Sequence, residues 1–205
     1  MVAPRAKKAR AGRNSRQVKV VITGPYGAGK TTLIKTMSEI AVLSTERKVT
    51  ENGAGHNGDG PAKPKTTVAM DFGRLTIDTE LQLYLFGTPG QKRFDFMWEI
   101  LAEGMLGFVI LVDAQREASY EEAAEILQFF KEAADVPYVV AVNKGDDEAD
   151  GGVDRARKWL HLPHEVRCVP LDARDKESVK GALLELLYSV LDDLDDLDAD
   201  EPAAV

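Results

Sequence analysis

The chain of 205 residues is poor in cysteine and histidine, with one Cys168 and three histidines. A single cysteine excludes an intramolecular disulfide and fits a reducing compartment, where thiols stay reduced. The histidines His56, His161 and His164 do not form a metal-binding set with the cysteine. We therefore expect Cys168 to be a small, packed residue of a strand.

Long apolar runs are also missing from the sequence. No segment has the pattern of a signal peptide or of a membrane-spanning helix. A prenylation cysteine is absent from Glu201–Val205, and Val2 stands where N-myristoylation requires glycine. We therefore expect a cytoplasmic protein that reaches a membrane only through partners.

Positive charge is in deficit, because 26 basic residues face 34 acidic ones and the net charge is −8. This balance argues against general nucleic-acid binding. Residues 1–17 are basic and lack an apolar pattern, which predicts a disordered arm. Residues 192–205 form an acidic tail, and we expect the last helix to fray past Leu194 because acidic charge opposes the dipole at a helix C-terminus. Residues 18–191 have the length of one domain.

The most informative motif is Gly24–Thr32, which matches the phosphate-binding pattern G-x-x-x-x-G-K-[ST]. A β-branched strand pattern, Val18–Ile22, precedes it, and apolar residues at helical spacing follow it. In this context the loop's N–H groups converge on an anion at a helix N-terminus. Lys30 adds positive charge for the β- and γ-phosphates, and the Thr31 hydroxyl is placed to ligate Mg²⁺. The predicted phosphate-binding residues are Gly24, Tyr26, Gly27, Ala28, Gly29, Lys30, Thr31 and Thr32.

A second motif, Asn143–Asp146, reads N-K-x-D and directly follows a buried-strand pattern. The Asp146 carboxylate can accept two hydrogen bonds from guanine, whereas adenine presents no such donor pair. The Asn143 amide can bond N7 of the base and tie the loop together, and the stem of Lys144 can cover the base. A buried polar group that the wrong base would leave unpaired gives effective discrimination. The motif therefore predicts binding of GTP and GDP.

The third motif is Gly87–Gln91, and at this point the chain resembles the Ras-like small GTPases, whose D-x-x-G-Q segment senses the γ-phosphate. The resemblance implies that Gly90 offers its N–H to the γ-phosphate and that Gln91 orients the attacking water. Two positions depart from the family. Gly87 replaces the aspartate that holds Mg²⁺ through a water, and Tyr26 replaces a glycine beside the γ-phosphate. Both departures predict slow intrinsic hydrolysis.

The segment Thr66–Phe72 resembles the Rab pattern T-I-G-V-D-F. The resemblance implies that Thr67 ligates Mg²⁺ in the GTP state, with Thr66 as the alternative, and that Lys30, Thr67 and Gln91 form the catalytic set. Residues 44–65, rich in Gly and Asn, precede this segment. In small GTPases such a loop is loose with GDP and tethered with GTP. A tolerated surface insertion is the alternative interpretation.

Asp172, Ala173 and Arg174 look like the S-A-K loop, in which a backbone N–H, here that of Ala173, touches guanine O6. A plain strand-to-helix turn explains the same residues equally well. The resemblance covers roughly residues 18–191. Within the family, the chain is similar to the prokaryotic small GTPases of the conservon and MglA-like types. It implies GTP/GDP and Mg²⁺ as cofactors, and a roadblock-type partner or a GTPase-activating protein as regulator.

Alternating strand and helix patterns predict an α/β fold with a doubly wound, mostly parallel sheet and one antiparallel edge strand, as in P-loop NTPases of the small-GTPase type. The antiparallel strand belongs to a hairpin that joins residues 68–77 to 81–86. The pair Ser119 and Glu122 predicts a capping box at the start of a helix. Residues 166–169 are expected to form the last strand. The nucleotide is expected beyond the carboxyl ends of the strands.

The sequence thus predicts a GTP-binding switch that hydrolyses GTP slowly and signals through a nucleotide-dependent loop. A nucleotide-binding scaffold with little or no hydrolysis is the competing class, because the same motifs serve both. An ATPase or kinase is a third interpretation, which Asn143 and Asp146 oppose.

Overall fold

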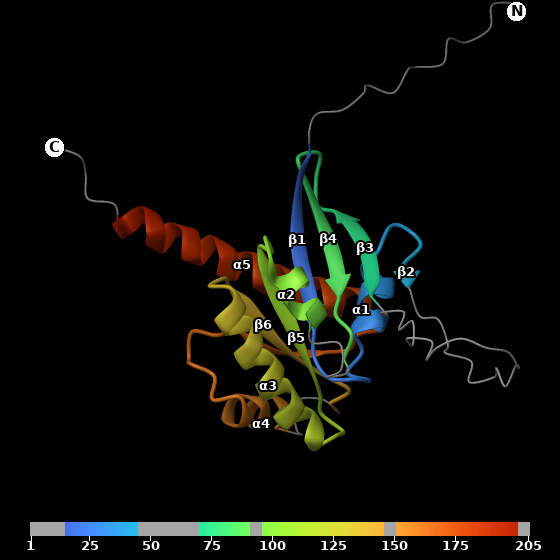
Figure 1. Ribbon diagram of the computed structural model, residues 1–205, viewed down its shortest axis with the longest axis vertical. Helices are drawn as coiled ribbons and strands as arrows, with labels where there is room; N and C mark the ends of the chain where they lie inside the picture. Colours follow the sequence, from blue (N-terminus) through green and yellow to red (C-terminus); the bar gives the residue numbers. More distant parts are fainter. Residues whose placement is uncertain (1–14, 45–69, 91–95, 146–150, 201–205) are drawn as a thin grey trace, which may run out of the picture.

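The computed structural model describes residues 15–44, 70–90, 96–145 and 151–200. Within them, strands and helices alternate along the chain (Figure 1). The strands are β1 (Arg16–Thr23), β2 (Leu43–Ser44), β3 (Asp71–Thr76), β4 (Leu81–Gly87), β5 (Gly107–Asp113), β6 (Tyr138–Asn143) and β7 (Cys168–Leu171). The helices are α1 (Lys30–Met37), α2 (Phe96–Ala102), α3 (Ala118–Ala133), α4 (Gly152–Trp159) and α5 (Lys176–Asp200).

The strands form one sheet in the order β2-β3-β4-β1-β5-β6-β7. β1 is parallel to both of its neighbours, β4 and β5, and the pairs β5–β6 and β6–β7 are parallel as well. β3 runs antiparallel to β4, with Asp71 opposite Gly87. The predicted mostly parallel sheet is confirmed. The two-residue β2 pairs antiparallel with β3 and forms the edge of the sheet, so this side has one strand more than the sequence predicted.

The core has two layers, one on each face of the sheet (Figure 1). α1 and α5 pack on one face, where Val20 and Ile22 of β1 lie, and α2, α3 and α4 cover the other face, which receives Val21. Every residue of β5 is buried. A strand covered on both faces needs a continuous apolar run, and this explains why Gly107–Asp113 lacks the alternation of a half-exposed strand.

The predicted capping box of α3 is wrong. The helix begins at Ala118, and no side chain caps it. Ser119 is buried within the first turn, and its Oγ accepts a hydrogen bond from the Asp113 N–H at 2.9 Å. Glu122 pairs with Arg116 at 3.0 Å instead. The serine hydroxyl therefore satisfies a backbone donor at the end of β5, a need that a local capping pattern does not reveal.

Several element boundaries differ from the sequence prediction. β1 begins at Arg16, two residues before the strand pattern Val18–Ile22. β7 begins at Cys168 because Val166 is held in a turn by a bond to Pro163 O at 3.2 Å. α5 continues to Asp200, beyond the expected fraying point (Figure 1).

One arginine bridges two acidic residues of α5. Arg167 pairs with Glu185 at 2.7 Å and with Asp192 at 2.6 Å, and so offsets part of the acidic charge of the helix. Opposite charge of this kind lessens the conflict between acidic residues and the helix dipole. None of the described helices is both long and apolar enough to cross a membrane.

Candidate functional site

The loop between β1 and α1 is fixed by glycines. Gly24, Gly27 and Gly29 have φ values of +131°, +79° and +110°. An added Cβ at Gly24 would lie 2.4 Å from Leu111 O, and one at Gly29 would lie 2.3 Å from Asn143 Nδ2. Neither position has room for a side chain. The backbone of the predicted phosphate-binding loop therefore packs directly on the ends of β5 and β6.

Lys30, the first residue of α1, is buried beneath this loop. Its Nζ donates to Gly24 O and to Pro25 O, both at 2.6 Å. Burial lowers the pKa of Lys30 to about 8, although the charges of Asp71 and Glu122 act in the opposite direction. A phosphate bound by the loop would also favour the charged ammonium, because an opposite charge at short range raises the pKa of a lysine.

Thr31 is the next residue of α1, and its hydroxyl donates to Asp71 Oδ2. Hydroxyl and carboxylate oxygens are hard ligands of the kind that Mg²⁺ prefers. Among the described residues, no group of three or more His, Cys, Asp or Glu side chains could hold a metal ion. The Thr31–Asp71 pair fits Mg²⁺ nonetheless, because this ion is usually bound by one or two protein ligands together with phosphate and water oxygens.

The loop after β4 lies against the phosphate-binding loop. The hydroxyls of Thr88 and Thr23 are buried and share a hydrogen bond of 2.9 Å. A Cβ added at Gly90 would lie 2.6 Å from both Lys30 Nζ and Tyr26 N. The backbone of Gly90 is thus brought directly beside the lysine.

α2 is fastened near both of its ends. The Trp98 Nε1–H donates to Pro89 O, in the loop after β4, at 3.2 Å. Lys19 of β1 donates from its Nζ to Glu103 O at 2.7 Å and to Ile100 O at 3.3 Å, at the helix C-terminus. A cation is favourable there because the last carbonyls of a helix carry partial negative charge.

Asn143 ties three loops together. Its Nδ2 donates to Ala28 O in the phosphate-binding loop at 2.8 Å, and its Oδ1 accepts from the Ala173 N–H at 3.1 Å. The Asn143 side chain is buried, with the residue 4% exposed. The N–H of Ala173, predicted to face the base, is engaged by this asparagine. The buried amide holds the end of β6, the phosphate-binding loop and the turn after β7 in one arrangement.

Lys144 follows in a left-handed backbone conformation, with φ of +64°. Its Nζ donates to Gly27 O at 2.9 Å and pairs with the buried carboxylate of Asp113 at 2.6 Å. Asp172 and Arg174, in contrast, form an exposed pair within one turn, with Arg174 Nε 3.1 Å from Asp172 Oδ1. Hydrogen bonds from Arg174 lower the pKa of Asp172 below its ordinary value.

The structure thus brings most of the described candidates to the carboxyl ends of the parallel strands. Tyr26 is 63% exposed at the rim, and Thr32 is exposed as well. Arg116, which the sequence analysis did not single out, donates from Nη1 to Tyr26 O at 2.6 Å. Four candidates lie outside the described residues, namely Thr66, Thr67, Gln91 and Asp146.

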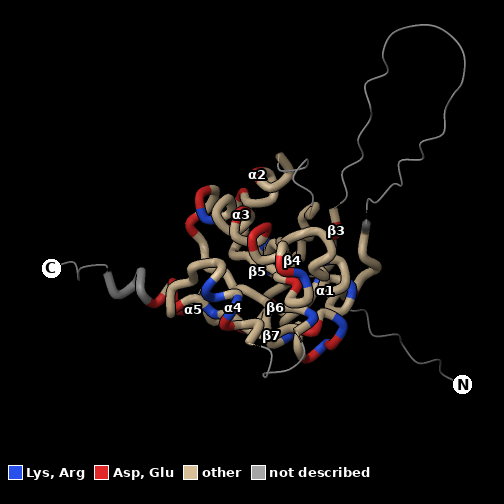
Figure 2. Tube along the Cα trace, turned by 90° about the horizontal axis from the view of Figure 1, so that it is seen from below, with Lys and Arg blue, Asp and Glu red and all other residues tan. Residues whose placement is uncertain are grey.

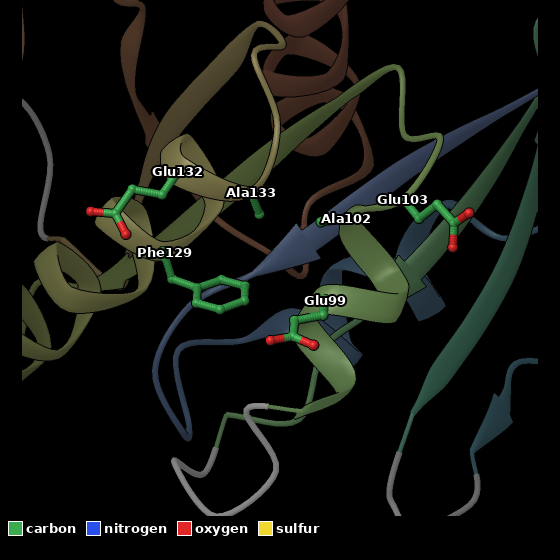
Figure 3. Close-up of a pocket in the computed structure, with 6 residues that line it drawn as sticks. All are labelled: Glu99, Ala102, Glu103, Phe129, Glu132 and Ala133. Carbon is green, nitrogen blue, oxygen red and sulfur yellow. The ribbon is translucent and has the colours of Figure 1, made fainter.

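A separate hollow lies between α2 and α3, as Figure 3 shows. It is lined by Glu99, Ala102, Glu103, Phe129, Glu132 and Ala133. Its three carboxylates would repel a phosphate group. Figure 2 shows basic residues on α4, whose last turn carries Arg157 and Lys158. The phosphate-binding loop is therefore the better candidate for an anionic ligand.

Comparison with known proteins places the chain near nucleotide-binding proteins. The family described as "Conserved hypothetical ATP binding protein" matches residues 22–197. The uncharacterized protein MJ1339 of Methanocaldococcus jannaschii is 34% identical over 130 residues, which cover 63% of this chain and 71% of that protein. Ras-related protein Rab-13 of Rattus norvegicus is 26% identical over 179 residues, covering 84% of this chain and 79% of its own length. Ras-related protein Rab-8A of Pongo abelii is 24% identical over 179 residues, covering 84% and 77%.

The match to the family extends from the end of β1 into α5 and so includes the described parts of the candidate site. The chain therefore belongs to the family of conserved hypothetical ATP-binding proteins and is a distant homologue of the Rab small GTPases, with the fold of a nucleotide-binding P-loop NTPase.

Proposed function

We propose that the protein is a GTP-binding switch that hydrolyses GTP slowly to GDP, like the prokaryotic small GTPases of the conservon and MglA-like types. The observation that carries the proposal is the double contact of the buried Asn143, which joins Ala28 of the phosphate-binding loop to Ala173. One side chain thereby sets the spacing between the loops proposed for the phosphates and for the base. Such a spacing suits a single ligand with phosphate at one end and a base at the other.

The proposed roles follow the chemistry of the residues. Lys30 and the amides of the loop neutralise phosphate charge, and Gly90 places its N–H at the γ-phosphate. Thr31 and Thr67 hold Mg²⁺, which supplies charge neutralisation at the β- and γ-phosphates when bound. Gln91 positions the attacking water. Catalysis then depends on positioning and on electrostatic stabilisation.

The choice of base is the first point to test, because the family description names ATP whereas Asn143–Asp146 favours guanine. GTP and ATP would compete against a fluorescent GDP analogue on the full chain. We expect guanine nucleotides to bind more tightly, and Asp146→Ala to abolish the preference. A tenfold preference for ATP would overturn the proposal.

The second point is hydrolysis. Under single-turnover conditions with Mg²⁺, we expect bound GTP to become GDP slowly, and Gln91→Ala to slow the conversion further. Full retention of GTP would favour a scaffold whose nucleotide is structural. A regulator of the roadblock type, or a GTPase-activating protein, should co-purify with one nucleotide state in preference to the other.

A further inference from the structure

The end of β4 holds a glycine beside the proposed Mg²⁺ ligand Thr31. Gly87 lies directly opposite Asp71 of β3 in the antiparallel pair. An added Cβ at Gly87 would lie 3.1 Å from Asp71 Cβ and 3.5 Å from Asp71 Oδ2. The Asp71 side chain therefore occupies the space into which a side chain at position 87 would point.

The carboxylate in this space is already oriented toward α1. Asp71 Oδ2 accepts the hydrogen bond of the Thr31 hydroxyl, and the charge of Asp71 acts to raise the pKa of Lys30. A carboxylate, a hydroxyl and an ammonium thus meet under the phosphate-binding loop. This set supplies one anionic and one neutral oxygen for a cation that also contacts phosphate.

We propose that Asp71, presented by β3, supplies the carboxylate of the Mg²⁺ site that Gly87 of β4 does not provide. The inference rests on the proposed function only in requiring that a nucleoside phosphate and Mg²⁺ bind at the loop. Asp71 acts through the oxygens around the metal, either by direct ligation or through a bound water, and has no part in proton transfer.

The experiment measures Mg²⁺ affinity separately from nucleotide affinity. Dissociation of a fluorescent GDP analogue is followed across a Mg²⁺ titration and in EDTA. We expect Asp71→Asn, which keeps the size and the oxygen of the side chain, to weaken Mg²⁺ by about 10–100-fold. Dissociation in EDTA should stay within twofold of the parent protein. Asp78→Asn, an exposed carboxylate in the β3–β4 turn, is the matched control and should leave both readouts unchanged.

A relocation experiment adds a second, independent readout. Asp71→Gly removes the side chain that crowds Gly87, and the double variant Asp71→Gly/Gly87→Asp moves the carboxylate to β4. The closest remaining atom would be Ile34 Cδ1, 2.8 Å from the new Cβ, which is the tip of a flexible side chain. We expect the double variant to bind Mg²⁺ at least tenfold more tightly than Asp71→Gly alone.

Two outcomes would overturn the inference: a Mg²⁺ affinity of Asp71→Asn within twofold of the parent, or equal acceleration of nucleotide release with Mg²⁺ and in EDTA. The second is the result expected if Asp71 only fastens α1 to β3. If the protein binds no guanine nucleotide, the proposed function fails on its own. The Asp71 comparison is then decided in the same way with a fluorescent ATP analogue.

Discussion

Replacing Asn143 by alanine tests whether the loops of the site are held together by one buried amide. The substitution removes the bond from Nδ2 to Ala28 O and the bond that Oδ1 accepts from the Ala173 N–H. Ala28 is fully buried and Ala173 is 2% exposed, so both backbone groups lie away from bulk water. The variant therefore leaves one buried acceptor and one buried donor without their partner.

The magnitude follows from the cost of unpaired buried groups. Each such group costs about 1–3 kcal/mol, so two groups cost about 2–6 kcal/mol before relaxation. A water that enters the vacated space would recover part of this energy. We expect the free energy of unfolding to fall by about 3 kcal/mol, a large share of the roughly 5–15 kcal/mol typical of a domain.

The assay is urea unfolding of nucleotide-stripped protein, because a ligand that binds only the folded state adds its own stabilisation. Asp78→Ala is the control. It also removes two bonds to backbone, from Glu80 N at 2.6 Å and Leu81 N at 2.8 Å, but in an exposed turn. Water replaces those bonds, so we expect a loss of about 1 kcal/mol or less.

The comparison can refute the reasoning. A loss below about 1 kcal/mol for Asn143→Ala would show that its two hydrogen bonds are not isolated from solvent. Equal losses for the two variants would show that burial does not set the cost.

Three further predictions concern the glycines and the cysteine. Gly24→Ala should cost about 3 kcal/mol in thermal unfolding, because its Cβ would meet backbone at 2.4 Å. Gly27→Ala, whose Cβ would make only an ordinary contact with Arg116 Nη1 at 3.7 Å, should cost about 1–2 kcal/mol for its left-handed backbone. Similar losses for the two variants would contradict the packing argument. The Cβ of Gly90→Ala would lie 2.6 Å from Lys30 Nζ, so in competition binding this variant should lose about tenfold more affinity for GTP than for GDP. An equal loss of affinity for both nucleotides would count against contact with the γ-phosphate. Burial raises the pKa of the Cys168 thiol to about 11. At pH 8 only about one thiol in a thousand is then the reactive thiolate. Alkylation of the folded protein by iodoacetamide should therefore be roughly 100-fold slower than alkylation in urea, and its rate should rise up to about pH 11. A rate independent of pH would refute the raised pKa.

Much of the fold could be predicted because its signals are local. The continuous apolar run of β5 predicts a strand covered on both faces, and the structure buries every residue of it. Ser119 shows where local signals fail. Its spacing to Glu122 suits a helix cap, but its hydroxyl serves the N–H of Asp113. That partner becomes visible only when β5 and α3 are placed together.

The candidate site divides in the same way. Gly24, Lys30 and Thr31 belong to one contiguous motif, so the sequence could identify them together. Asp71 and Arg116 reach the same loop from distant segments, through the pairing of β3 with β4 and through the turn before α3. The role proposed for Asp71 depends on its register opposite Gly87. A shift of one residue would turn its side chain to the other face of the sheet.

The two attachments of α2 have a mechanical consequence. Lys19 anchors the carboxyl end of this helix to the central strand β1. Trp98 donates a hydrogen bond to Pro89 O, in the loop beside Lys30. A displacement of that loop would therefore be transmitted to the buried Trp98, while the bonds of Lys19 would resist a sliding of the helix along the sheet.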